Sequence, residues 1–488
     1  MKRQIKEYMS HVRSQFGTRS SKMGSYSFIV TAIVLAILIT VNVALSFLPD
    51  SYTQADLTAN HLYSISSETK VMLSSLEEDI TIYWVVVAGE EDVYIEKLLQ
   101  NYEDYSSKVK VEKKDPDLNP DFTGAYTDET VYSNSIIVES GDKYRYISYE
   151  DMYETTSSDM YSMYYGTSDT EFAGEKQITS AISYCTAEDT PVVHVLEGHG
   201  ETALSDSFTQ ALETDNLATE SLSLLSGDAV PDDVECILIN APASDISEEE
   251  RDMLTEFLDS GGRVLIMSGT VTDEELPNLN AVAEHYGISV MEGVVIEANT
   301  DYYVYGSQAL LMPELGSSEI TDSLAEDNYN LIVPVSKALD ISEASEDVTV
   351  TELLSSSSDS YIKEEGYEIE SYEKEDGDAE GPLTLAALVT KDVSDDEQMQ
   401  LVWIASSLML EDAYNQYSSD ANEDFVLNAL EMMCEKEDSI DIHNKSLSGE
   451  YLTVSTSDAS FIKVMTIGVI PAFYLIFGII DVVRRKRR

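Results

Sequence analysis

Two long apolar runs stand near the two ends of the chain. Residues 26–48 (YSFIVTAIVLAILITVNVALSFL) carry no charge, and at about 1.5 Å per residue a helix of that length crosses about 30 Å of hydrocarbon. Residues 464–480 (VMTIGVIPAFYLIFGII) are shorter and contain Pro471, which a membrane helix tolerates when a neighbouring helix satisfies the freed carbonyl. We predict transmembrane helices at 25–48 and 464–483. The alternative for the first run is a cleaved signal peptide, although its apolar stretch exceeds the usual roughly 7 to 15 residues.

Between these runs, strand and helix periods alternate. Over residues 50–187 the spacings predict a strand, a helix, a strand, a hairpin and a closing helix, in the order 80–86, 95–102, 109–115, 135–147 and 171–185. A β-α-β unit followed by a hairpin and a helix is the order of elements in a thioredoxin-like fold. No Cys-x-x-Cys motif is present for redox chemistry. We therefore predict a thioredoxin-like exported domain here.

The second predicted domain, residues 188–450, alternates over a longer stretch. Strands are expected at 191–196, 235–240 and 263–267, and helices through 208–212, from a capping box of Ser247 and Glu250, and at 277–286. This alternation predicts a parallel sheet with helices on both faces, flavodoxin-like or Rossmann-like. After residue 300 an acidic, Ser-rich segment at 355–381 interrupts the pattern before strands at 383–389 and 399–406 and a helix at 424–433.

The distribution of charge predicts how the chain crosses the membrane. Residues 1–24 hold six Lys and Arg and one Glu, and residues 484–488 are all Lys or Arg. Basic residues beside a span favour the cytoplasmic side, so we expect both tails in the cytoplasm and the region between the spans outside the cell membrane. That region holds 17 Lys and Arg against 89 Asp and Glu, a net charge of −72. Such a surface repels nucleic acid and anionic headgroups, and no nucleic-acid partner is expected.

One motif resembles a cofactor site. Residues 198–203 match the dinucleotide fingerprint G-x-G-x-x-A after a predicted strand, and Glu220 lies where a ribose-binding acid would stand. The fingerprint works because bare backbone lets pyrophosphate approach a helix N-terminus. Glu201 would put a carboxylate beside that anion, and the domain is predicted to lie outside the cytoplasm, where nicotinamide cofactors are scarce. We interpret Gly198 and Gly200 as a tight turn and expect no cofactor.

Patterns for catalysis are missing from the sequence. There is no P-loop and no G-x-S-x-G nucleophile elbow. The nearest match is Ser268 in LIMSGT, where Ile and Thr stand in place of the two glycines. The three cysteines, Cys185, Cys236 and Cys434, are too few and too scattered to suggest a disulfide framework or a Cys-x-x-Cys motif. We predict no catalytic residues.

Two stretches were considered as metal sites. His194, His199 and Glu201 are close in sequence but lack the H-E-x-x-H spacing. The stretch DPDLNPD at 115–121 is similar to the start of a calcium loop, but its sixth position is Pro and its twelfth position is Tyr126 rather than Glu. We expect a turn there and no metal site.

An ordered series of segments resembles the gliding-motility-type (GldG-like) auxiliary proteins of ABC transporters. The series begins with DLTANHLYSISSETKVMLSSLEEDITIYW at 56–84 and continues through 171–184, 192–201, 246–269, 276–297 and 422–447. The resemblance implies a non-catalytic exported part on an amidotransferase-like fold, acting with a separate ABC permease and a cytoplasmic ABC ATPase. IASS at 404–407 and IMSG at 266–269 depart from the Gly-Asp-Ser and Asp-Pro that relatives tend to show, which weakens the idea of a shared polar site.

These features predict a membrane-tethered accessory subunit of an ABC export or motility complex. Two other classes stay open. One is a surface-anchored hydrolase with an unrecognised nucleophile. The other is a module that binds envelope glycan through the Tyr-rich segment at 149–165, since exposed aromatic residues suggest a binding surface. Tyrosines in such an acidic loop can equally be solvated or packed locally.

The charge distribution gives a first testable prediction, on topology. A cysteine placed within 355–381 should react with a membrane-impermeant thiol reagent on intact cells, whereas a cysteine at Ser14 should react only after lysis, because basic tails stay on the cytoplasmic side. The measurement is the labelling of each variant before and after lysis. Labelling at Ser14 in intact cells would contradict the predicted orientation.

Overall fold

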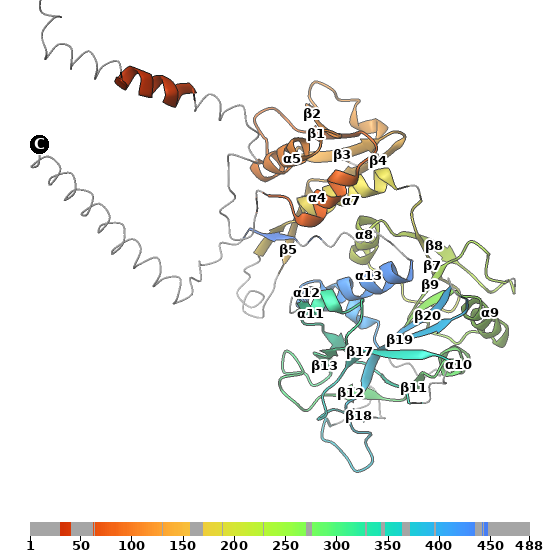
Figure 1. Cartoon of the computed structure of the whole chain (residues 1–488). Coiled ribbons are helices and arrows are strands. Elements are labelled where there is room, and N and C mark those ends of the chain that lie inside the picture. Colours follow the sequence, from red (N-terminus) through yellow and green to blue (C-terminus); the bar gives the residue numbers. More distant parts are fainter. Residues whose placement is uncertain are drawn as a thin grey trace, which may run out of the picture.

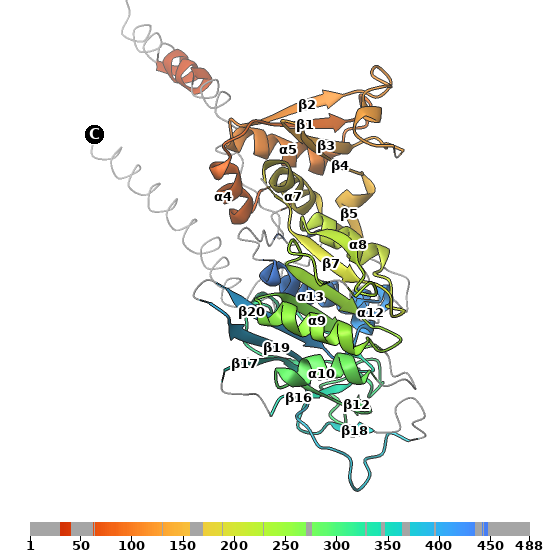
Figure 2. The same ribbon diagram turned by 90° about the vertical axis from the view of Figure 1, so that its right-hand side faces the viewer.

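The structure is a computed structural model that describes residues 30–40, 62, 64–128, 130–156, 169–187, 189–227, 229–269, 276–326, 329–342, 347–363, 371–394, 397–434, 442 and 444–447. Residues 64 onward form a smaller α/β domain, at the top of Figure 1, and a larger α/β domain below it. Helices α7 (Gly174–Thr186) and α8 (Asp206–Thr214) lie where the two domains meet (Figure 2). The α/β class expected from the alternating pattern is confirmed.

The first domain is built on a four-stranded sheet in the order β2-β1-β3-β4. Its strands are β1 (Ile80–Val85), β2 (Val109–Lys114), β3 (Ser135–Ser140) and β4 (Lys143–Ile147). β1 and β2 are parallel, and the other pairs are antiparallel. Ile80, Ile82 and Trp84 alternate onto the face covered by α4 (Ser67–Ser75), α5 (Val93–Tyr105) and α7, and all three are buried in one core cluster. The predicted β-α-β unit, hairpin and closing helix are present in this order.

A small sheet brings the end of the described chain back to the first domain. It has the order β21-β6-β5 and consists of β5 (Tyr153–Thr156), β6 (Asp169–Phe172) and β21 (Lys445–Ser446). Lys445 lies opposite Phe172 in the antiparallel pairing of β21 with β6. The sequence pattern had grouped residues up to 450 with the second domain, but β21 pairs with a strand of the first.

The second domain contains one large sheet with the main order β11-β16-β19-β20-β10-β9-β7-β8. Five neighbouring strands are parallel: β8 (Ala218–Leu222), β7 (Val192–Leu196), β9 (Cys236–Asn240), β10 (Arg263–Met267) and β20 (Gln398–Ile404). The sheet continues with antiparallel pairings of β19 (Thr384–Asp392), β16 (Ala338–Asp340), β11 (Ser289–Met291), β17 (Thr349–Ser355) and β14 (Glu314–Leu315).

The predicted parallel sheet is present from β8 to β20, but the sheet as a whole is mixed, because the strands from β19 onward pair antiparallel. β19 and β20 are separated in the chain by residues 393–397 only. Parallel neighbours need a crossover of a dozen or more residues, whereas a connection this short makes a hairpin. The two apolar segments at 383–389 and 399–406 were recognised as strands, but the direction in which they pair follows from the short connection.

Helices cover both faces of the parallel half, as predicted. On one face, α8 and α13 (Ala421–Met433) pack against Leu238 and Leu265. On the other, α9 (Glu248–Asp259) and α10 (Pro277–His285) pack against Ile237 and Ile266. Each strand therefore buries alternate side chains on opposite faces, and two apolar clusters form the core.

Shorter elements complete the second domain. They are the strand pairs β12 (Val294–Ile296) with β18 (Tyr361–Lys363) and β13 (Leu310–Leu311) with β15 (Val333–Pro334), the helices α11 (Asp322–Glu326) and α12 (Asp412–Tyr417), and the 3-10 turn η4 (Leu408–Leu410). The first domain contains the 3-10 turns η1 (Thr123–Ala125) and η2 (Glu150–Met152).

The second predicted membrane span and about half of the first lie outside the described residues. Of the first predicted span, residues 30–40 are described and form a helix with exposed side chains. The second predicted span, 464–483, and both basic tails lie outside the described part of the chain. Among the residues that the structure describes, no helix combines the length and the apolar character needed to cross a membrane.

A buried ion pair joins three remote segments of the chain. Glu175, in the first turn of α7, has a side chain that is 2% exposed, and its Oε2 lies 2.5 Å from Nζ of Lys445. Lys445 also donates to the carbonyl of Ser64 at 2.6 Å. The second oxygen of Glu175 accepts from the backbone N–H of Ser66 at 2.6 Å and from the hydroxyl of Thr69 at 2.7 Å.

These contacts decide the charge state of Glu175. Burial raises the pKa of this carboxyl, but the charge of Lys445 and the hydrogen bonds from Lys445, Ser66 and Thr69 together outweigh burial, so that its pKa lies below the ordinary 4.5. The carboxylate is therefore charged at neutral pH and fully matched. Removing its partner would leave a charge inside the domain.

Lys445→Met should destabilise the first domain, because breaking a buried ion pair by removing one partner typically costs about 3–5 kcal/mol. The double variant Glu175→Gln/Lys445→Met should recover part of the loss, since no unmatched charge remains. Thermal unfolding of each purified variant checks this. Lys110→Met is the control, because the Lys110 side chain is 67% exposed beside Glu112. Equal melting temperatures for Lys445→Met and Lys110→Met would contradict the prediction.

Candidate functional site

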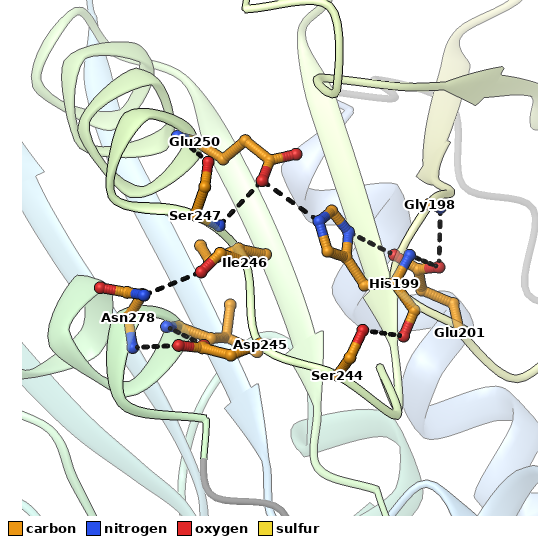
Figure 3. A network of polar contacts seen from close by, with 10 residues as sticks. Gly198, His199, Glu201, Ser244, Asp245, Ile246, Ser247, Glu250 and Asn278 are labelled. Carbon is orange, nitrogen blue, oxygen red and sulfur yellow. Dashed lines mark hydrogen bonds and ion pairs between the residues drawn. The ribbon is translucent and has the colours of Figure 1, made fainter.

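The topology of the second domain marks one place where a ligand would be expected. From β7 the chain goes to β8 on one side of β7, and then to β9 on its other side. The point where the strand order reverses lies outside the carboxyl ends of β7 and β9, and open α/β sheets bind ligands in the crevice there. The two loops at this point are residues 197–205 and 241–247, and they form the candidate site (Figure 3).

Two glycines make the first of these loops turn tightly. Gly198 has a φ of 137° and Gly200 a φ of 72°, both in the region that favours glycine. A Cβ at Gly198 would come within 2.8 Å of the Leu225 side chain, and one at Gly200 within 3.2 Å of the Ala243 side chain. The interpretation of this motif as a tight turn from strand to helix agrees with this geometry, and a β-branched residue would be strained at either position.

The carboxylate of Glu201 fills the position that a phosphate would take. Its Oε2 accepts the backbone N–H of Gly198 at 3.0 Å and that of His199 at 2.8 Å. The following helix, α8, has its own N-cap, because the hydroxyl of Ser205 accepts from the backbone N–H of Phe208. The N–H donors of a dinucleotide-binding turn are thus directed at the chain's own oxygens here.

His199 lies between two carboxylates, as Figure 3 shows. Its Nδ1 is 3.2 Å from Oε1 of Glu201, and its Nε2 is 3.2 Å from Oε2 of Glu250. The three side chains are only 6%, 7% and 5% exposed. Each ring nitrogen of His199 therefore faces one buried carboxylate oxygen.

Glu250 links this cluster to the start of α9. Its Oε2 accepts the backbone N–H of Ser247, and its own N–H donates to the Ser247 hydroxyl, which completes the predicted capping box. Burial raises the pKa of Glu250, but the Ser247 and His199 contacts outweigh burial and hold that pKa below 4.5. Its Oε1 is buried and has no hydrogen-bond partner among the described residues.

The two loops are also hydrogen-bonded to each other through their backbones. The carbonyl of His199 accepts from the N–H of Ala243 at 3.0 Å and from the N–H and hydroxyl of Ser244 at 2.9 and 3.1 Å. Thr202 and Asn240 exchange two further bonds, of 2.9 and 2.8 Å. These bonds join the loop after β7 directly to the end of β9 and the loop that follows it.

The other residues singled out in the sequence do not join this cluster. The Ser268 hydroxyl is buried and accepts the indole N–H of Trp403 at 2.8 Å, so the nearest match to a nucleophile has a packing role. His194 faces Glu220 on β8, with 3.9 Å between Nε2 and Oε2. Within the described ranges, no group of three or more His, Cys, Asp or Glu is arranged to hold a metal ion.

The described part of the Tyr-rich segment is packed rather than presented to solvent. The hydroxyls of Tyr149 and Tyr153 both contact Oδ2 of Asp92, at 3.3 and 2.7 Å. Their rings pack on each other, with 5.3 Å between centroids, and Tyr153 also packs on Phe172. Residues 157–168 lie outside the described residues. For these two tyrosines, local packing replaces the glycan platform considered from the sequence.

Comparison with protein families gives the class of the protein. Residues 190–429 match the family model described as an ABC-type uncharacterized transport system. Residues 59–152 match a domain of unknown function. No curated protein matches the chain. The first match supports an auxiliary protein of an ABC-type transport system, as the sequence resemblance implied, and it covers most of the second domain.

Solved structures give weaker likenesses. The mmIFT52 N-terminal domain is 19% identical with a TM-score of 0.38, and the match covers 51% of this chain and 99% of that one. The structure of PurLQS from Thermotoga maritima is 11% identical with a TM-score of 0.26, covering 50% of this chain and 100% of that one. With TM-scores this low, neither likeness assigns a function.

Sequence reasoning found His199, Glu201 and Glu250 separately but did not connect them. Glu250 was recognised only as the third residue of a capping box. In the structure, His199 lies between the buried carboxylates of Glu201 and Glu250. The signal that could have found the pair is that His199 lies in the loop after one strand, and Glu250 in the first turn of the helix that follows the neighbouring strand.

His199→Ala should lower the free energy of unfolding by about 3 kcal/mol, because it leaves two buried carboxylates without their shared donor. The measurement is denaturant unfolding of the purified protein at pH 7. His285→Ala is the matched control, since His285 lies at the exposed end of α10. A further variant, Glu250→Gln, tests the pH dependence. A carboxyl with a lowered pKa stabilises the fold above about pH 4.5, and this contribution is lost as the pH falls through the lower folded-state value.

Glu250→Gln should therefore remove part of the acid sensitivity of the wild type below pH 4.5. A His199→Ala variant as stable as His285→Ala, with an unchanged acid profile in Glu250→Gln, would show that the cluster contributes nothing to the fold.

Proposed function

We propose that this chain is a membrane-tethered, non-catalytic accessory subunit of an ABC export or motility complex, of the gliding-motility (GldG-like) type. The observation that carries the proposal is the match of residues 190–429 to an ABC-type transport family. The large domain acts as a scaffold outside the cytoplasm. The energy for transport comes from a separate ATPase, since the sequence has no P-loop.

The candidate site supports a scaffold more than an enzyme. Glu201 occupies the backbone donors that would hold an anion, and Ser244 and Asn240 close the loops across the crevice. A catalytic site at this position needs donors free to meet a substrate and a nucleophile with a base in reach. The Ser268 hydroxyl is engaged by Trp403 instead. The polar groups of the candidate site instead form hydrogen bonds that join β7, β9 and α9.

The path of the chain supports two membrane spans that lie close together. Ser64 follows the first predicted span and Lys445 precedes the second, and the two residues are in hydrogen-bond contact at 2.6 Å. The described residues Ser64 and Lys445 thus bring the two span-facing ends of the α/β region to one place on the first domain. Gly468 and Gly478 in the second predicted span are small residues that allow close approach of another helix. A multi-span permease is the partner that such a pair of helices would contact.

Co-purification in mild detergent tests this function. We expect a multi-span permease and a cytoplasmic ATPase to accompany the protein. Replacing residues 464–483 with an unrelated apolar helix of equal length should weaken the association, because the specific helix contacts are lost while the anchor remains. Circular dichroism of the variant checks that the two α/β domains stay folded.

If the complex survives that replacement, the contact with the transporter lies in the α/β domains and not in the second span. Recovery of no transporter subunit at all would contradict the proposal and favour a surface-anchored hydrolase or a glycan-binding module.

A further inference from the structure

Two cysteines far apart in the sequence are brought together at one edge of the parallel sheet. Cys236 is the first residue of β9, and Cys434 is the C-cap of α13. Arg263, the residue opposite Cys236 on β10, reaches across this edge and donates from Nη1 to the carbonyl of Met433 at 2.7 Å. Because Met433 directly precedes Cys434, this contact fixes the end of the helix beside the start of the strand.

The two thiols lie in the same environment. Cys236 is fully buried and Cys434 is 6% exposed, and both belong to the same apolar cluster. Interaction with the Cys434 thiol, together with burial, raises the pKa of Cys236 well above its ordinary 9.0. Both are free thiols in this structure. The third cysteine, Cys185, is also buried but lies in the core of the first domain, where its thiol contacts the carbonyl of Val138.

We propose that Cys236 and Cys434 form an oxidisable pair, which a disulfide-bearing oxidant converts into an intramolecular disulfide between β9 and α13. The sequence had shown only three scattered cysteines, with no framework. The fold changes this, because a disulfide requires proximity in space and not in sequence.

The chemistry proceeds by two thiol–disulfide exchanges. Cys434, the more exposed thiol, loses its proton and attacks one sulfur of the oxidant, R–S–S–R, so that a Cys434–S–S–R bond forms and one R–S⁻ leaves and takes up the proton. Cys236 then loses its proton and attacks the Cys434 sulfur, which forms the intramolecular bond and releases the second R–S⁻. Two protein thiols are oxidised and one disulfide is reduced to two thiols.

The bond would fix the last helix of the second domain. After α13 the chain returns to the first domain, where β21 pairs with β6. A crosslink that closes so long a loop restricts the unfolded chain strongly, and it would keep α13 on the sheet when the returning segment is pulled. Persistence of the bond in the cell relies on the extracytoplasmic position proposed above. Its formation in the purified protein does not, so the two proposals can fail separately.

The test uses the full chain, purified under reducing conditions and then incubated with oxidised glutathione. The protein is denatured, alkylated and mapped by mass spectrometry. We expect the number of alkylated cysteines to fall from three to one, with Cys185 as the one that remains and a crosslinked peptide pair containing Cys236 and Cys434. Three alkylated cysteines after oxidation, or glutathione adducts without the crosslink, would overturn the proposal.

Matched variants separate the pair from the third cysteine. Cys185→Ala should still form the crosslink, whereas Cys434→Ser should leave Cys236 reduced. Oxidation should raise the melting temperature by about 5 °C in the wild type and in Cys185→Ala, but not in Cys434→Ser. An unchanged melting temperature in a crosslinked wild type would refute the stabilising role. If Cys434→Ser fails to fold, the peptide map of the wild type still decides whether the pair forms.

Discussion

A carboxylate inside a protein must be matched by charge and by hydrogen-bond donors, and at Glu175 this requirement organises the ends of the molecule. Lys445 supplies the charge, and Ser66 and Thr69 supply donors from the other end of the described chain. Meeting the requirement places β21 on β6, so the chain returns to the first domain after passing through the second. The second domain is thereby held at both of its ends, because the chain enters it after α7 and the returning strand β21 lies beside the start of α7 through Lys445 and Glu175.

The second domain applies the same rule where its fold offers a ligand position. His199 lies between Glu201 and Glu250, and the backbone bonds of Ala243 and Ser244 join the two loops. Contacts between the domains are of the same polar kind, since Arg145 of β4 donates to the carbonyl of Glu213 at 2.8 Å, beyond the end of its own domain. These polar groups fix the loops to each other and the two domains to each other.

The sequence by itself determined most of the local structure. The alternation at 80–86 specified a strand with one buried face, and Ser247 with Glu250 specified where α9 begins. The two glycines after β7 specified a tight turn, and the ordered segments of the chain were sufficient to recognise the ABC auxiliary class. These features depend on residues that are close in the sequence. Hydrophobic periodicity, helix capping and the backbone freedom of glycine all act between such near neighbours, so the sequence alone reveals them.

Only the tertiary structure decided which residues meet. Glu250 was visible as a cap, but its contact with His199 requires the loops after β7 and β9 to lie side by side. Likewise, Glu175 and Lys445 meet only because β21 pairs with β6. A sequence shows which residues can carry a charge or a thiol. The partner that makes the burial of such a residue favourable is set by how whole strands and helices pack. No local sequence pattern contains the order of the strands in the sheet.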